Sequence, residues 1–153
     1  MRQLGPDETL LLELCARHGV QALIIGGHAV AFHGYPRYTG DLDIFYGMTE
    51  ANTERLYEAL QAFWGPRVPL VAGPGDLRVR GDVLQYGHVP HRVDFLNRMG
   101  TVPFDEAWRE RCDGPLPLPV LSLRHLLQAK RDAGRPKDLI DIDRLTRTNH
   151  AEE

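Results

Sequence analysis

Two short motifs, a glycine pair and an aspartate pair, constrain the fold of this 153-residue chain more than any other feature. Gly26 and Gly27 end an apolar run, and the segment Asp41-Leu42-Asp43-Ile44 begins the next one. Because side chains alternate along a strand, Asp41 and Asp43 are expected to project from the same face. Like charges at this spacing repel each other. A hard divalent cation such as Mg²⁺ would relieve this repulsion by binding to both carboxylates.

The segments around these motifs are predicted to alternate between strands and helices. The apolar run 20–25 has the length of a strand, and 28–33 is predicted to be a short helix. A strand, two glycines and a helix in this order suit a phosphate, because glycine allows close backbone approach and a helix start offers free N–H groups. Further helices are predicted over 7–18, from the Thr49 cap to before Gly65, near 104–111, from Ser122 to about 132 and from Pro136 to about 145. Further strands are predicted over 42–46 and 92–96, and residues 77–79 and 83–86 are predicted to form a hairpin.

We therefore expect one α/β domain over residues 1–153, with a mixed β-sheet, flanking helices and C-terminal helices from about 122 to 147. Its 42% apolar and 25% charged residues are typical of a globular protein. A net charge of -3 gives no long-range attraction to nucleic acid, although a local basic patch can still bind RNA.

The sequence also indicates a compartment. Asp7 and Glu8 lie in an N-terminal segment without a signal-peptide core, and no apolar run approaches the roughly 18 residues that span a bilayer. Cys15 and Cys112 are isolated and lack metal-ligand spacing, which favours reduced structural thiols. We expect a cytoplasmic protein that does not associate with membranes.

A third carboxylate, Asp94, lies in the segment His91-Arg92-Val93-Asp94-Phe95-Leu96, where Val93 and Phe95 share the opposite face of a predicted strand. Together, Ile25-Gly26-Gly27, the spacer 28–40, the aspartate pair and Asp94 resemble the signature of the nucleotidyltransferase superfamily. With Arg37-Tyr38-Thr39-Gly40 before the pair and Arg135-Pro136-Lys137-Asp138-Leu139-Ile140-Asp141 near the end, the chain is most similar to small bacterial toxin-like and antibiotic-modifying nucleotidyltransferases.

The resemblance implies a nucleotidyltransferase-like sheet and a Mg²⁺-dependent enzyme that transfers a nucleoside monophosphate from an NTP to a hydroxyl acceptor and releases pyrophosphate. Asp41 and Asp43 would hold Mg²⁺ against the triphosphate, and Asp94 would help to hold a second ion and to deprotonate the acceptor. Mn²⁺ is the alternative ion. The acceptor is a tRNA, a protein or a small molecule, and a cognate antitoxin of a toxin-antitoxin pair or a second copy of the chain is the expected protein partner. The rival function is that of a noncatalytic binding protein on the same fold.

The expected nucleotide-binding residues each have a simpler alternative. Paired glycines commonly make a tight turn, His28 either contacts phosphate or caps the helix, and Arg37 is by default a solvated loop residue. The candidates are Gly26, Gly27, His28, Arg37, Thr39 and Lys130.

Lys130 continues the apolar stripe of the predicted helix from Ser122, so its stem is expected to pack there and to bring the ammonium to the edge of a cleft. Asp138 and Asp141 lie on one helix face and favour an ion-pair network with nearby cations, with positioning of Lys130 as a second role.

Two other site types are disfavoured. His88 and His91 form a His-x-x-His that Pro90 interrupts, which argues against zinc, and the sequence contains no P-loop motif.

Overall fold

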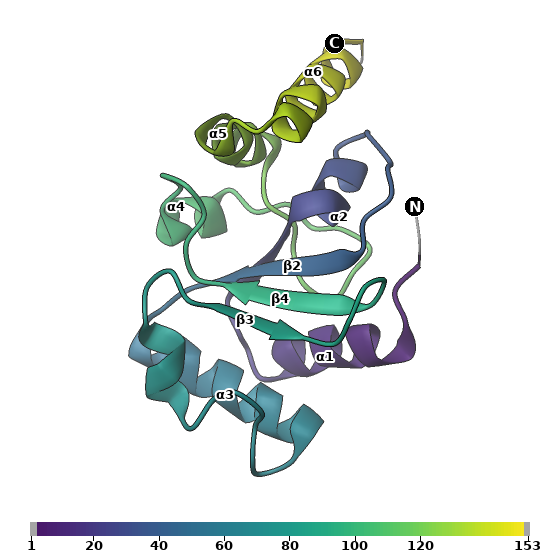
Figure 1. The fold of residues 1–153 in the computed structure, drawn as a ribbon. Coiled ribbons are helices and arrows are strands. Elements are labelled where there is room, and N and C mark those ends of the chain that lie inside the picture. The colour runs from purple at the N-terminus through teal and green to yellow at the C-terminus, as the bar shows by residue number, and fades with distance from the viewer. Residues whose placement is uncertain (1–2, 152–153) are drawn as a thin grey trace.

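The structure, a computed structural model, describes residues 3–151 and consists of a mixed β-sheet with helices on both faces (Figure 1). The elements in chain order are α1 (Pro6–Arg17), β1 (Ala22–Ile25), α2 (Gly26–Phe32), β2 (Asp41–Tyr46), α3 (Glu50–Trp64), the 3₁₀ helix η1 (Pro74–Arg78), β3 (Val83–Tyr86), β4 (Arg92–Leu96), α4 (Phe104–Arg109), α5 (Leu123–Ala133) and α6 (Pro136–Ala151).

The sheet has the strand order β1-β2-β4-β3. The two central strands, β2 and β4, run parallel, whereas β1 and β3 pair antiparallel at the edges. The expected α/β class and mixed sheet are therefore confirmed.

Helices cover the two faces of the sheet differently. Figure 1 shows α1 and α3 on one face and α2, α5 and α6 on the other. Leu42 and Ile44 of β2 are fully buried. Leu42 is the register partner of Val93, which lies beside residues of α1 and α3, so these apolar side chains build the core on that face. Asp41 and Asp43, at the alternate positions of β2, consequently face the side of α2, α5 and α6.

Side-chain caps fix two helix starts where the sequence predicts them. The Thr49 hydroxyl accepts a hydrogen bond from the Asn52 backbone N–H at 3.2 Å, and Ser122 does the same for His125 at 3.2 Å. Gly134, in the left-handed conformation with φ of 61°, ends α5 and turns the chain into α6.

The predicted hairpin of 77–79 with 83–86 is wrong. Pro74 begins the 3₁₀ helix η1 instead, which packs against α3 and buries Leu77. Strand β3 pairs with the following strand, β4, because that pairing extends the sheet and joins Tyr86 to the apolar layer of Val93. Two boundaries also differ: α2 starts at Gly26 rather than at His28, and α6 continues to Ala151.

Within residues 3–151, none of the helices combines the length and the apolar character that a membrane crossing requires.

Candidate metal and nucleotide site

Three aspartate side chains meet on the α2 side of the central strands. Asp43 and Asp94 are direct partners in the parallel register of β2 and β4, and Asp41 precedes Asp43 on the same strand face. One carboxylate oxygen from each residue lies within 4.8 Å of the other two, so the group is close enough to hold a metal ion. Asp94 is 5% exposed, whereas Asp41 and Asp43 are half-buried.

Arg92 is bound to two of these carboxylates. Its Nε donates to Asp94 Oδ1 at 3.0 Å, and its Nη2 donates to Asp94 Oδ2 at 3.1 Å and to Asp41 Oδ2 at 3.0 Å. The guanidinium is permanently charged and therefore offsets part of the repulsion between the aspartates. The pairing with Asp94 follows from two positions on one strand face, but the contact with Asp41 depends on strand register and is not predicted from the sequence.

Asp43 has the most perturbed pKa of the three. Burial, together with the smaller effect of the negative charges of Asp41 and Asp94, raises the pKa of its carboxyl to about 8. The cluster therefore opposes full ionisation in the absence of a cation.

The glycine pair makes room for the site rather than forming a loop. Gly26 has φ of 65°, and a Cβ there would overlap the Asp43 carboxylate oxygen Oδ2. A Cβ on Gly27 would lie 2.6 Å from the Cβ of Thr39. Because real Cβ atoms do not come this close to other atoms, glycine is required at both positions for this packing.

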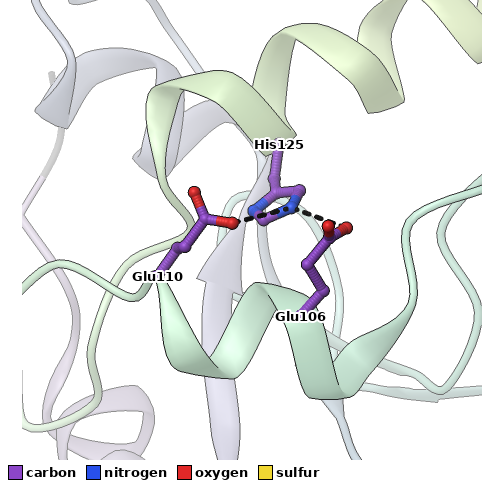
Figure 2. A group of neighbouring side chains, drawn as sticks. All are labelled: Glu106, Glu110 and His125. Carbon is purple, nitrogen blue, oxygen red and sulfur yellow. Dashed lines mark hydrogen bonds and ion pairs between the residues drawn. The ribbon is translucent and has the colours of Figure 1, made fainter.

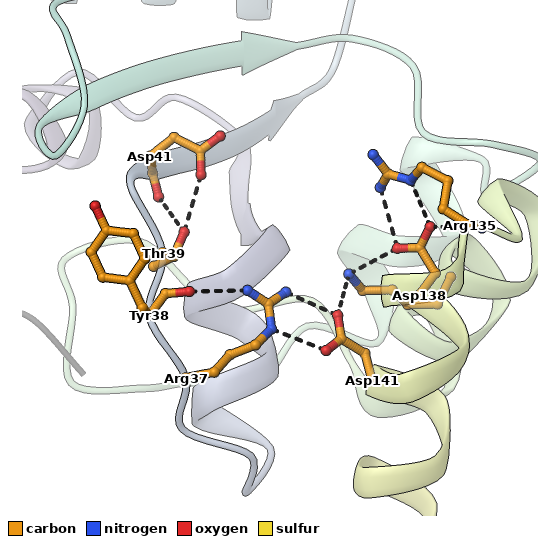
Figure 3. A network of polar contacts seen from close by, with 8 residues as sticks. Arg37, Tyr38, Thr39, Asp41, Arg135, Asp138 and Asp141 are labelled. Carbon is orange, nitrogen blue, oxygen red and sulfur yellow. Dashed lines mark hydrogen bonds and ion pairs between the residues drawn. The ribbon is translucent and has the colours of Figure 1, made fainter.

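Two other predicted nucleotide-binding residues are Thr39, which lies just before Asp41 in the chain, and His28, which lies on α2. The Thr39 hydroxyl lies 3.0 Å from both the backbone oxygen and Oδ1 of Asp41, to which it donates, and thus orients that carboxylate (Figure 3). His28 is 4% exposed in the first turn of α2. Such burial leaves little of its surface for a phosphate and favours a structural role.

The remaining candidates, Arg37 and Lys130, belong to an ion-pair network between the loop before β2 and helices α5 and α6 (Figure 3). Arg37 binds Asp141 with two hydrogen bonds, at 3.0 Å from Nε and 2.9 Å from Nη2. Lys130 Nζ lies 2.8 Å from Asp141 Oδ2 and 3.3 Å from Asp138 Oδ1, and Arg135 Nε lies 2.6 Å from Asp138 Oδ2. The ammonium of Lys130 is thus held between two carboxylates.

The side chains of this network are joined by several hydrogen bonds and ion pairs. The network carries a net positive charge, because it contains three cations and two aspartates. Burial alone would raise the pKa of Asp141, but hydrogen bonds from Arg37 and Lys130 outweigh it and lower that pKa. In the same way, hydrogen bonds from Arg135 outweigh burial at Asp138 and lower its pKa.

Arg135 connects the network electrostatically to the aspartate cluster. Its pKa is raised, first by the hydrogen bond to Asp138 and in smaller part by the charge of Asp43. The guanidinium side chain is 57% exposed and therefore accessible to a ligand. Arg135 begins the C-terminal motif that ends at Asp141, but no feature of the sequence singles it out as a site residue.

A second group with metal-binding geometry consists of Glu106, Glu110 and His125 (Figure 2). The buried His125 ring places Nε2 3.1 Å from Glu106 Oε2 and 3.6 Å from Glu110 Oε2. Arg124 also pairs with both glutamates. The hydrogen bond from His125 is the main cause that lowers the pKa of Glu106, and the hydrogen bond from Arg124 is the main cause that lowers the pKa of Glu110. Because Arg124 already supplies positive charge here, this group is better suited to joining α4 to α5.

A cavity of about 310 Å³ lies on the opposite face of the sheet and is lined in part by Trp64, Tyr86 and Val93. His88 and His91 also line it, and His91 Nδ1 lies 2.6 Å from Glu8 Oε1. Because this cavity lies on the other face of the sheet, it is separate from the aspartate cluster.

The chain matches no protein-family model and no curated protein.

Proposed function

We propose that the chain is a Mg²⁺-dependent nucleotidyltransferase with a nucleotidyltransferase-like sheet, acting from an NTP on a hydroxyl acceptor. The single observation that carries the proposal is the meeting of Asp41, Asp43 and Asp94 on adjacent parallel strands, with oxygens within 4.8 Å of one another. The net positive network that includes Arg135 supports it, because triphosphate needs cationic contacts beyond those of a metal.

The donor set fits Mg²⁺. All three groups offer carboxylate oxygens, the ligands that hard divalent ions prefer, and Mn²⁺ accepts the same ligands. Asp41 and Asp43 would hold the ion, and the glycine at position 26 leaves room for the Asp43 carboxylate, which a Cβ there would overlap. When bound, such an ion supplies Lewis-acid stabilisation of the phosphate oxygens.

The proposed reaction is an in-line displacement. The acceptor oxygen forms a bond to the α-phosphorus, the bond from that phosphorus to the bridging oxygen breaks, and pyrophosphate leaves. Asp94 stands beside the pair that would bind the ion. In this proposal it would orient the acceptor hydroxyl or help to deprotonate it. Arg135 would bind the outer phosphates, while Lys130 and Arg37 hold the wall from which it projects.

The first test is calorimetric binding of each of the four ribonucleotides with and without Mg²⁺. We compare the unmodified chain with the Asp41→Asn/Asp43→Asn variant and with Glu106→Gln/Glu110→Gln, which changes the other carboxylate group by the same chemistry. Mg²⁺-dependent binding that only the aspartate variant loses is the expected result. A preferred ribonucleotide then serves, with a label on its α-phosphate, to search tRNA, protein and small-molecule acceptors for transfer.

Two results would contradict the proposal. Absence of nucleotide binding by the folded chain would favour the noncatalytic alternative, in which the fold serves only to bind a partner. Equal loss of binding in both double variants would show that the aspartate cluster is not the specific site.

A further inference from the structure

The guanidinium of Arg92 occupies the part of the aspartate cluster nearest Asp94. Its Nε and Nη2 bind both Asp94 oxygens, and Nη2 also reaches Asp41 Oδ2. Asp41 and Arg92 are direct partners in the register of β2 and β4, so the side chain starts beside the carboxylate that it bridges to. The contact is thus built into the sheet.

The oxygens not bound by Arg92 lie on the other side of the cluster. Among residues 3–151, no hydrogen bond or ion pair joins Asp43 to a cationic side chain, and Asp41 Oδ1 receives only the Thr39 hydroxyl. A cation would therefore find its open ligands at Asp41 and Asp43, while Asp94 is already satisfied by a bidentate partner.

The charge of the cluster also indicates that it has room for one divalent cation beside Arg92. Three carboxylates and one guanidinium leave two negative charges when all are ionised, which is the charge that one divalent ion neutralises. Two divalent ions would leave an excess of positive charge around Arg92 before any substrate binds. Repulsion of that kind is costly at the short distances found here.

We infer that Arg92 takes the place of a second metal ion, so that the site holds one divalent cation, on Asp41 and Asp43. The inference rests on the proposed function and replaces the two ions that the family resemblance implies. Arg92 is a positioning residue for Asp94, and it adds a fixed positive charge beside the reacting phosphate. Its Nη1, which makes no hydrogen bond within residues 3–151, is left to donate to a phosphate or acceptor oxygen.

The test is the number of Mn²⁺ ions bound per chain, measured by calorimetry and by the electron paramagnetic resonance of free Mn²⁺. We expect one ion for the unmodified chain and two for Arg92→Gln, because removal of the guanidinium frees both oxygens of Asp94. Arg98→Gln is the matched control, since Arg98 is an exposed arginine just after the same strand, and it should still bind one ion.

A second variant keeps the test decisive if Arg92→Gln folds poorly. Arg92→Lys retains one positive charge and should still bind one ion, with circular dichroism confirming its fold. Two ions on this variant would overturn the charge argument.

The outcomes separate this inference from the proposed function. Two ions on the unmodified chain overturn the role of Arg92 and leave the proposed function standing. One ion on both the unmodified chain and Arg92→Gln also overturns it. Absence of Mn²⁺ and of nucleotide binding in the unmodified chain contradicts the proposed function, and the inference fails with it.

Discussion

Asp43 of β2 and Asp94 of β4 are direct partners across the parallel pair of central strands, and both carboxylates leave the same face of the sheet. Like charges placed opposite each other in a sheet destabilise it unless another charge compensates. Arg92 compensates Asp94, which leaves Asp43 as the main source of unfavourable charge in the metal-free site.

We predict that Asp43→Asn stabilises the metal-free protein at pH 8. The folded pKa of about 8 lies above the ordinary value of 3.8 for an aspartate, so the folded state keeps a proton that the unfolded state loses. The contribution of Asp43 to stability is therefore greatest below pH 4 and falls as the pH rises through 8. Urea unfolding in the presence of a chelator should show a gain of roughly 1 to 3 kcal/mol for the variant at pH 8, less than the pKa shift alone implies because the site admits solvent. A difference that does not grow between pH 5 and pH 8 would contradict it.

Gly26→Ala should abolish divalent-ion binding, whereas Gly19→Ala should not. Both glycines have positive φ, 65° and 70°, so either alanine costs about 1 kcal/mol of backbone strain. Only at Gly26 does the new Cβ overlap the Asp43 carboxylate, while at Gly19 it meets nothing within 4 Å. Mn²⁺ titration and thermal unfolding of the two variants, run side by side, separate strain from displacement of the ligand. Retained ion binding in Gly26→Ala would show that Asp43 can move without losing the site.

Lys130→Met should lower the free energy of unfolding by roughly 2 to 4 kcal/mol, since it removes a buried cation from two buried carboxylates. Methionine keeps most of the apolar stem, so the decrease in the free energy of unfolding measures the effect of removing the charge. Arg37 and Arg135 still pair with Asp141 and Asp138, which limits the effect. The control is Lys137→Met on the exposed surface of α6. Urea unfolding that does not distinguish the two variants would count against a structural role for the network.

The Glu106→Gln/Glu110→Gln variant should keep its bound divalent ion and lose thermal stability at low salt. Arg124 already pairs with both glutamates, of which Glu106 is half-buried and Glu110 exposed, and salt screens such pairs. The variant and the unmodified chain should therefore differ less in melting temperature at 1 M NaCl than at low ionic strength. An ion lost here but retained in Asp41→Asn/Asp43→Asn would move the metal site to the second cluster.

The two cysteines should react with a thiol reagent at different rates. Cys15 is fully buried, and burial raises its thiol pKa to about 12, whereas Cys112 is partly exposed. Because the thiolate is the reactive form, one thiol per chain should react under native conditions and the second only on unfolding. With a reagent that releases a chromophore, absorbance gives the number of thiols that react in the native and in the unfolded state. Two rapid reactions in the native state would contradict the burial of Cys15.

Much of the site's local structure follows from the sequence. The Asp41 and Asp43 side chains share a face because strand alternation requires it, and the Thr49 and Ser122 caps mark helix starts at the predicted positions. The faces of β4 were also predicted correctly, with Val93 in the core and Asp94 outside it.

What the sequence does not contain is the relation between distant segments. The contact of Arg92 with Asp41 depends on the register of two strands whose residues lie far apart in the chain. Lys130 was expected to bring its charge to a cleft edge, but the turn at Gly134 brings α6 alongside α5, and the ammonium pairs with Asp138 and Asp141. The predicted hairpin of 77–79 with 83–86 is wrong for a similar reason, since η1 packs against α3 and β3 pairs with β4.

The alternation along β2 has a practical consequence. In the first four positions of this strand, Leu42 and Ile44 belong to the core, while Asp41 and Asp43 carry the charges. The two carboxylates can therefore be removed without changing the apolar side chains of this strand that build the core. Under the proposed function, the Asp41→Asn/Asp43→Asn variant should therefore still fold, and it could serve to capture an acceptor without modifying it.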